Sequence, residues 1–246
     1  MEKEINKKQN SSPDSGCDST LLLIRGFDIF SNLTEAEYES LNLVHNFIEA
    51  GKGDFIYFPS QNHRKLYFMK KGFIKIGYID EAGNECIKEV IQPGEVFGQL
   101  TLEKNALQDE FAQAYKSEVS LCAFDIEDFL VLLEKKPQMA IAFSHHLGKK
   151  VRKVETRLQN LLNKTVLSRL INLLIQLIPV ESGAANSASI DRFLTHDDMS
   201  KLIGASRQTV TTTIAQLENQ GLISIQKNKI HIPNIELLKK AALSHS

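Results

Sequence analysis

The pattern of hydrophobic and polar residues divides the chain into a strand-rich part followed by a helix-rich part. Between residues 54 and 125, short apolar or alternating stretches are separated by glycines at turn positions. Successive side chains of a strand point to opposite faces, so such stretches are typical of half-buried β-strands. We predict strands within residues 54–59, 65–80, 84–91, 94–100 and 118–125. Many short strands with close turns predict an antiparallel roll or barrel.

A long amphipathic helix is predicted after this region. Residues 125–137 first form a short helical stretch that Pro137 ends. Residues 138–163 then carry a narrow apolar stripe at alternating spacings of four and three, made of Leu147, Val151, Val154, Leu158 and Leu161. A narrow stripe on a long helix favours a partner helix, so we predict that two chains pair through it as a homodimer. The alternative is a helix that packs on its own domain.

The last third of the chain begins with a hinge and a further helix. Thr165 interrupts the long helix and is a candidate N-cap for the helix that follows, which Pro179 ends. Residues 180–192 are small and polar and predict a surface loop. Thr195 and Asp198 are then spaced as in a capping box and predict the start of a short helix.

The segment from Gly204 to residue 232 has the pattern of a winged helix-turn-helix. Gly204 ends the first short helix, Ser206 can cap the second, and Gly221 ends it. Two short helices joined by a tight glycine turn predict a helix-turn-helix. Residues 222–226 and 229–232 are strand-like and predict a two-stranded wing with a basic tip.

Composition indicates an ordinary soluble chain. Apolar residues make up 42% and charged residues 24%. No apolar run approaches the roughly 20 residues of a membrane span, and the polar N-terminus is not a secretory signal. Residues 1–20 are expected to be a disordered tail. Three widely spaced cysteines predict a cytoplasmic protein with neither a disulfide framework nor zinc.

Charge is distributed unevenly along the chain. The net charge is −1, but residues 145–246 hold 14 basic and 7 acidic residues, a balance of +7. Residues 1–144 hold 15 basic and 23 acidic residues, a balance of −8. This asymmetry predicts that the C-terminal part binds a polyanion.

The exposed side chains of the second short helix suit base readout. Arginine can donate two hydrogen bonds to guanine, glutamine can pair with adenine, and threonine can contact a polar base edge or the thymine methyl. Lysines at the wing tip suit backbone phosphates. The candidate DNA-binding residues are Thr195, His196, Lys201, Ser206, Arg207, Gln208, Thr211, Thr212, Lys227 and Lys229.

Two other classes of protein share parts of this pattern. A helical hairpin followed by a β-hairpin can bind proteins, so the alternative function is a sensor or scaffold without specific DNA readout. A cupin-type enzyme also has a small β-barrel, but it needs two or three histidines and a carboxylate on the barrel strands. Only His63 falls within the predicted roll, and no GxSxG, phosphate-binding-loop or paired Cys/His pattern occurs. We therefore expect no enzymatic activity.

The blocks, in this order, resemble the CRP/FNR family of bacterial transcription factors. The resemblance covers about residues 25–235 and is carried by YFMKKGFIKIGYIDEAGNE, PGEVFGQLTL, the long helix with its hinge, and LTHDDMSKLIGASRQTVTTTIAQLENQGLISIQKNKIHI. It implies an α+β chain with an N-terminal, antiparallel, cyclic-nucleotide-binding-like β-roll. The expected domains are a tail at 1–20, the β-roll effector domain at 21–136, the dimerisation helix and hinge at 137–164, the winged helix-turn-helix at 165–235 and a C-terminal tail at 236–246.

The family's cyclic-AMP pocket is degenerate in this chain. The resemblance implies a Gly-Glu-Leu motif that holds the ribose and an Arg-Ser pair that holds the phosphate. These positions fall here on Gly98, Gln99 and Leu100, and on Asp109 and Glu110. Two carboxylates repel a phosphate, and no arginine lies between Arg64 and Arg152. We predict that cyclic AMP does not bind in the family's usual way.

Other ligands of the family meet similar objections. Iron–sulfur members carry four cysteine ligands, whereas this chain has three cysteines. Haem ligation by a lone His63 or His45, and 2-oxoglutarate binding through Lys104 and Lys116, stay open. We expect no cofactor and no metal site, and the small-molecule effector, if there is one, is unidentified.

The resemblance also implies the macromolecular partners. These are a double-stranded DNA operator, a second copy of the chain and RNA polymerase, the last through the loop at Val180–Asp191. Many family members have Gly-Arg or Ser-Arg where this chain has Thr211 and Thr212, and Gln208 replaces a common glutamate. We therefore expect a pseudo-palindromic operator that differs from the family's usual half-site.

Overall fold

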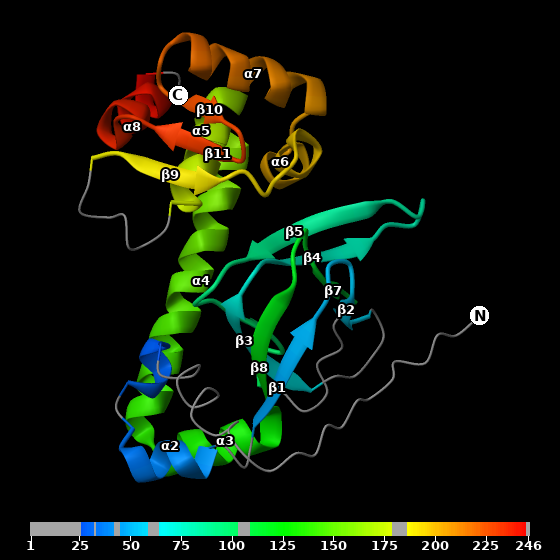
Figure 1. Ribbon diagram of the computed structural model, residues 1–246, viewed down its shortest axis with the longest axis vertical. Helices are drawn as coiled ribbons and strands as arrows, with labels where there is room; N and C mark the ends of the chain where they lie inside the picture. Colours follow the sequence, from blue (N-terminus) through cyan, green and yellow to red (C-terminus); the bar gives the residue numbers. More distant parts are fainter. Residues whose placement is uncertain are drawn as a thin grey trace.

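The computed structural model describes residues 26–31, 33–41, 45–58, 64–102, 109–178 and 186–244. A β-roll lies beside the lower part of a long helix, and a winged helix lies at the helix's far end (Figure 1). The predicted α+β class, with an antiparallel roll, a long helix and a C-terminal helix-turn-helix, is confirmed. The predicted tail at 1–20 lies outside the described residues.

The roll consists of two antiparallel sheets of four strands each. One sheet has the order β1-β8-β3-β6 and the other the order β2-β7-β4-β5. The strands are β1 His45–Ala50, β2 Phe55–Tyr57, β3 Lys65–Lys71, β4 Ile74–Ile79, β5 Glu85–Ile91, β6 Val96–Gly98, β7 Phe111–Ala114 and β8 Val119–Asp125. The hydrophobic pattern does not predict β1 and β7. β1 is a largely exposed edge strand that pairs only with β8, and β7 has four residues, so neither carries a long alternating pattern.

Short helices close the end of the roll beside the long helix. They are the 3₁₀ helix η1 Asp28–Phe30, α2 Glu35–Leu41 and α3 Ile126–Lys135. Their apolar side chains join an aromatic cluster in which Phe68, Phe124 and Phe129 contact one another at ring-centroid distances of 5.3 to 6.0 Å. This cluster extends to Met139 and Phe143, which anchor the start of the long helix on the roll.

The long helix α4 spans Pro137–Asn163, one residue earlier than predicted. Pro137 lies in its first turn, where the missing amide hydrogen costs nothing, so it begins α4 as well as ending α3. Leu147 of the predicted stripe packs partly on the roll's aromatic cluster. Val151, Val154 and Leu158 are exposed by 56%, 68% and 55%, so the described chain leaves this part of the stripe uncovered.

The winged helix begins at the predicted hinge. The Thr165 hydroxyl accepts a hydrogen bond of 3.3 Å from the Ser168 amide and caps α5 Val166–Gln176. The further elements are β9 Ala188–Asp191, α6 His196–Ile203, α7 Arg207–Asn219, β10 Ser224–Gln226, β11 Lys229–Ile232 and α8 Ile235–Ser244. No helix within the described ranges is long and apolar enough to cross a membrane.

Two segments of this domain differ from the sequence prediction. The end of the predicted surface loop forms β9, which pairs with β11 and makes the wing a three-stranded sheet. Residues 235–244, expected to lie mostly in a tail, form α8. Burial explains both differences. Ile190 of β9 and Leu238 of α8 are buried in the domain core, which favours a strand and a helix over an exposed loop.

The roll and the winged helix share one hydrophobic cluster. Ile87 and Val90 of β5 belong to the same cluster as the core of α5, α6 and α7. The rings of Phe73 and Phe193 stack with centroids 3.9 Å apart. The Tyr115 hydroxyl donates a hydrogen bond to the Asp198 carboxylate. The winged helix is therefore held directly on the roll as well as through α4.

Candidate nucleic-acid interface

The turn between α6 and α7 is set by local capping contacts. Thr195 and Asp198 form the predicted capping box, with the Asp198 amide donating to the Thr195 hydroxyl at 3.0 Å and the Thr195 amide donating to the Asp198 carboxylate at 2.8 Å. Gly204 ends α6 with φ of 62°, the left-handed conformation that favours glycine. The Ser206 hydroxyl accepts from the Thr209 amide at 3.0 Å and starts α7. These contacts fix the orientation of α7 against α6.

Helix α7 has a buried face and a polar exposed face. Val210, Ile214 and Leu217 are buried in the domain core, as their spacing predicts, and Thr213 is buried beside them. The opposite face exposes Arg207, Gln208, Thr211 and Thr212. The predicted base-reading residues therefore share one solvent-facing surface.

The three consecutive threonines all turn their hydroxyls back to the helix. Thr211 donates to the Arg207 carbonyl at 2.9 Å and Thr212 to the Gln208 carbonyl at 3.1 Å. Thr213 donates to the Thr209 carbonyl at 2.8 Å, which gives this buried hydroxyl a partner. A hydroxyl that donates its hydrogen to the backbone retains acceptor lone pairs. The exposed Thr211 and Thr212 therefore present acceptors and methyl groups, chemistry that suits a base amino group or a thymine methyl.

A basic concavity of about 550 Å³ lies beside the start of α7. Cationic side chains dominate it, and among the described residues Asp197 is the only carboxylate that lines it. It is lined by Lys116, Arg192, Leu194, Thr195, His196, Asp197, Arg207, Lys227 and Asn228. Four cations around one carboxylate make a surface that attracts phosphate groups.

Two of these cations, Arg192 and Lys116, were not among the candidate DNA-binding residues. Arg192 follows β9 directly, in the segment predicted as a loop, and its sequence neighbours include Asp191, Asp197 and Asp198, so no local run of positive charge marks it. Lys116 lies in the turn between β7 and β8 of the roll, far from Arg207 in the sequence, and no local pattern connects them. Burial is the main cause that lowers the pKa of Lys116; Asp198 opposes this shift and Arg192 adds to it.

His196 stands between the two helices of the motif. Its Nδ1 atom lies 2.9 Å from the Thr211 hydroxyl. Its Nε2 atom is buried and has no hydrogen-bond partner among the described residues. Burial, followed by the charges of Arg192 and Arg207, lowers the pKa of His196, so the neutral imidazole predominates at neutral pH.

Two of the predicted DNA-binding lysines lie close to carboxylates. Lys201 pairs with Asp197 at 3.0 Å along α6 and does not line the basic concavity. Lys229 lies 3.9 Å from Asp191, with both side chains more than 60% exposed. Exposed pairs of this kind are weak, so Lys229 remains accessible to a phosphate.

The residues at the predicted effector pocket lie within the roll. Gly98 has φ of 95°, and a Cβ atom there would collide with the Lys65 carbonyl oxygen. Gln99 is buried, and Leu100 is partly buried. Glu110 accepts hydrogen bonds from the Tyr57 hydroxyl at 3.1 Å and from Lys88 at 2.6 Å.

The Glu110 carboxylate is therefore largely buried in the roll. Its side chain is 13% exposed. Burial and the neighbouring Glu110 raise the pKa of Tyr57, whose ring packs 5.7 Å from that of Tyr67. Asp109 is exposed. The Glu110 carboxylate, at a position where the resemblance implies the phosphate-binding pair, is thus held by the Tyr57 hydroxyl and Lys88.

The remaining ligand candidates are placed only in part. His63 and Lys104 lie outside the described residues, and the His45 side chain is not described. Lys116 lies in the basic concavity beside the winged helix. Because Lys104 is not described, 2-oxoglutarate binding through Lys104 and Lys116 stays a prediction.

Comparisons with known proteins agree with this arrangement. The family model of the cyclic nucleotide-binding domain matches residues 47–136, and the model of the Crp-like helix-turn-helix domain matches residues 168–241. The chain is 29% identical over 179 residues to the global nitrogen regulator of Nostoc sp. (strain PCC 7120 / SAG 25.82 / UTEX 2576), covering 72% of this chain and 80% of that protein.

Solved structures show the same fold. FixK2 from Bradyrhizobium japonicum superposes with a TM-score of 0.69 at 19% identity, covering 80% of this chain and 96% of that one. A transcriptional regulator of the CRP/FNR family from Thermus thermophilus superposes with a TM-score of 0.62 at 23% identity, covering 82% of this chain and all of that one.

Proposed function

The chain belongs to the CRP/FNR family of transcription regulators, and we propose that it binds a pseudo-palindromic DNA operator as a homodimer. The observation that carries the proposal is the exposed face of α7, with Arg207, Gln208, Thr211 and Thr212 beside the basic concavity. Arg207 and Gln208 read base edges in the major groove, and the threonines add acceptors and methyl groups. Lys116, Arg192, Lys227 and Lys229 bind phosphates of the flanking backbone.

The uncovered stripe of α4 supports the homodimer. Val151, Val154 and Leu158 are large apolar side chains on one face of a helix, and each is more than half exposed. Pairing two such helices removes this surface from water and sets the separation of the two α7 helices. Half-site centres about 10 base pairs apart follow from recognition helices in successive major grooves.

The Glu110 carboxylate supports the proposal that operator binding does not depend on cyclic AMP. A cyclic phosphate in the usual position would meet this largely buried carboxylate and no arginine of the described roll except Arg64. Arg64 pairs with Glu127 at the start of α3. We expect no binding of cyclic AMP in calorimetry at concentrations that saturate cyclic-AMP-dependent relatives.

RNA polymerase and a small-molecule effector complete the proposed partners. The loop expected to contact polymerase spans residues 180–191, of which 180–185 lie outside the described residues. Activation or repression then depends on where the operator lies relative to the promoter.

Selection of bound duplexes from random DNA tests the operator proposal. We expect an enriched pseudo-palindrome, and Arg207→Ala should weaken binding to it by about 1–3 kcal/mol and relax the preference at one base pair. Lys239→Ala is the matched control, because Lys239 pairs with Glu236 on α8, away from the basic concavity. Absence of any enriched sequence would favour a sensor or scaffold without DNA readout.

Sedimentation of the Val154→Glu variant tests the dimer. One charge per chain at the centre of the stripe should convert a dimer to a monomer, whereas Glu155→Gln on the same helix should leave the dimer intact. A wild-type chain that sediments as a monomer at micromolar concentration would contradict pairing through α4.

A further inference from the structure

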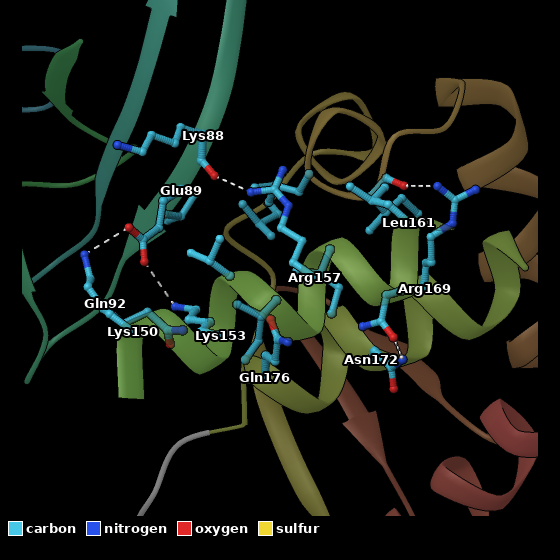
Figure 2. A pocket seen from close by; sticks show the side chains of 18 of the residues that line it. Lys88, Glu89, Gln92, Lys150, Lys153, Arg157, Leu161, Arg169, Asn172 and Gln176 are labelled. Atoms are coloured by element: carbon cyan, nitrogen blue, oxygen red, sulfur yellow. Dashed lines mark hydrogen bonds and ion pairs between the residues drawn. The ribbon is translucent and has the colours of Figure 1, made fainter. Parts of the chain in front are cut away.

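A cavity of about 380 Å³ lies where the roll, the long helix and the winged helix meet. β5 contributes one wall, α4 and α5 form the floor, and α6 contributes the remaining side (Figure 2). Most of its lining is apolar and comes from both domains, including Val90, Leu173, Leu177, Leu194, Leu202 and Ile203. Its volume lies in the range of small-molecule sites in proteins.

Four cationic side chains of α4 and α5 line the same cavity, and two of them are neutralised. Lys150 lies 3.1 Å from the Glu89 carboxylate, and Lys153 lies 3.3 Å from Glu89 and 3.0 Å from Glu95. Burial alone would raise the pKa of Glu89, but the two lysines lower it, so its charge is maintained. These four groups balance one another.

The other two cations, Arg157 and Arg169, bond to backbone carbonyls and to no carboxylate of the described residues. Arg157 donates to the Lys88 carbonyl, and Arg169 donates to the Ile203 and Gly204 carbonyls at 2.6 and 3.2 Å. Within the described residues, neither arginine forms an ion pair with a carboxylate. The Nε atom of Arg169 is buried and has no hydrogen-bond partner there. Glu89, which Lys150 and Lys153 already pair, also attracts Arg157. Neither guanidinium group at the cavity has a carboxylate ion-pair partner of its own within the described residues.

We propose that this cavity binds a small amphipathic organic anion, with a carboxylate at Arg157 and Arg169 and an apolar body against the leucine wall. Guanidinium groups suit carboxylates because their planar donors can make paired, charge-assisted hydrogen bonds. An uncharged ligand would leave both guanidinium charges unpaired, and a cation would be repelled. The site borders the degenerate pocket of the roll, because Leu100 lines the cavity and Lys88, which also lines it, pairs with Glu110.

Because the lining comes from both domains, ligand binding at this site can influence how the two domains are arranged. A ligand that contacts β5, α4, α5 and α6 together is sensitive to the position of the winged helix on the roll. Binding therefore shifts the balance between arrangements of the two domains by its difference in affinity for them. Val154 and Leu161 line the cavity and also belong to the α4 stripe, so pairing of two chains through this stripe would cover part of the cavity's lining.

Methyl NMR of the full chain with labelled leucines tests the site with phenylbutyrate as the probe. We expect shifts of the Leu173, Leu194 and Leu202 methyls and a Kd of about 1 mM, given a ligand of this size. The methyls of Leu121, in the core of the roll, should not move. Phenylbutanol has the same body without the charge and should bind at least about 10-fold more weakly.

Substitutions separate the charge from the cavity. Arg157→Gln and Arg169→Gln should each weaken phenylbutyrate binding by about 10-fold, the loss of one charge-assisted contact. Arg152→Gln is the matched control, because Arg152 is exposed on α4 and does not line the cavity. Arg157→Gln keeps the proposal testable if Arg169→Gln disturbs the end of α6.

Three results would overturn the proposal. They are no shift of the lining methyls at about 10 mM phenylbutyrate, ten times the expected Kd, equal binding of phenylbutanol, or unchanged binding in both arginine variants. The inference adds a ligand site to the proposed function. Because the titration contains no DNA, its failure leaves operator binding standing, and failure of operator binding leaves the titration interpretable.

Discussion

Lys116 offers the sharpest test of the basic concavity, because it belongs to the roll and not to the DNA-binding motif. The concavity brings it together with Arg192, Arg207 and Lys227. If Lys116 binds a phosphate, the roll takes part directly in operator binding. The Lys116→Ala variant removes this contact and leaves α7 unchanged.

The magnitude follows from counterion release. Each neutralised phosphate contributes a slope of about −0.9 to the dependence of log K on log salt. Lys116, Arg192 and Lys227, counted twice in a homodimer, predict a slope of about −5 from this surface. Lys116→Ala should make the slope less steep by about 1.8 and weaken binding up to about 60-fold at about 0.1 M salt.

Fluorescence anisotropy with the selected operator, over a salt series, measures both quantities. Lys239→Ala removes an exposed lysine of α8 and should leave slope and affinity unchanged. An unchanged slope in Lys116→Ala would refute a phosphate contact at this position, even if the affinity fell. A fall in affinity that differed among operator sequences would instead indicate base readout.

Three further predictions concern a cap and two titrating groups. Thr165→Ala should lower the free energy of unfolding by about 1 kcal/mol in urea denaturation, because the Ser168 amide loses its cap; Thr165→Ser should retain most of it. Operator affinity should rise as the pH falls from about 8 to about 6, because neighbouring DNA phosphates raise the lowered pKa of His196 and binding takes up a proton. The His196→Gln variant should show a weaker dependence of affinity on pH. An equally steep pH dependence in this variant would exclude His196 as its source. Asp198→Asn should destabilise the chain by about 1 kcal/mol at neutral pH. Burial alone would raise the pKa of Asp198, but hydrogen bonds from Thr195 and Tyr115 outweigh it and lower this pKa. The stability contributed by the Asp198 carboxylate is therefore present above its unfolded pKa of 3.8 and is lost as the pH falls through the folded pKa. A difference in unfolding free energy between wild type and variant that grows below about pH 4 would contradict this assignment.

The threonines of α7 show how local structure refines a candidate residue. A β-branched residue is a moderate helix former, and three in succession are unusual at an exposed helix face. Their hydroxyls donate to carbonyls one turn earlier, so the helix accommodates each of them without an unpaired donor. In the proposed operator complex, Thr211 and Thr212 would therefore face DNA with acceptors and methyl groups, whereas Thr213 belongs to the core.

The sequence by itself determined the features that depend on neighbouring residues. The caps at Thr165, Thr195 and Ser206 and the left-handed turn at Gly204 follow from contacts within about four residues, and the spacing of the apolar residues identifies the buried face of α7. Such contacts form in any context that allows the helix, so spacing and residue type suffice to predict them. The order of roll, long helix and helix-turn-helix was predictable for the same reason.

Only the tertiary structure decided which distant groups meet. Lys116 and Arg207 share the basic concavity, and Arg157 and Arg169 share a cavity with β5, although nothing near either pair in the sequence links them. β7 and β9 have four residues each and β1 is a largely exposed edge strand, so none of them carries a clear alternating pattern and pairing with their neighbours determines them. The function of a charged side chain depends on the groups packed around it, because burial and neighbouring charges set its partners and its pKa. Packing between domains cannot be predicted from a local sequence pattern.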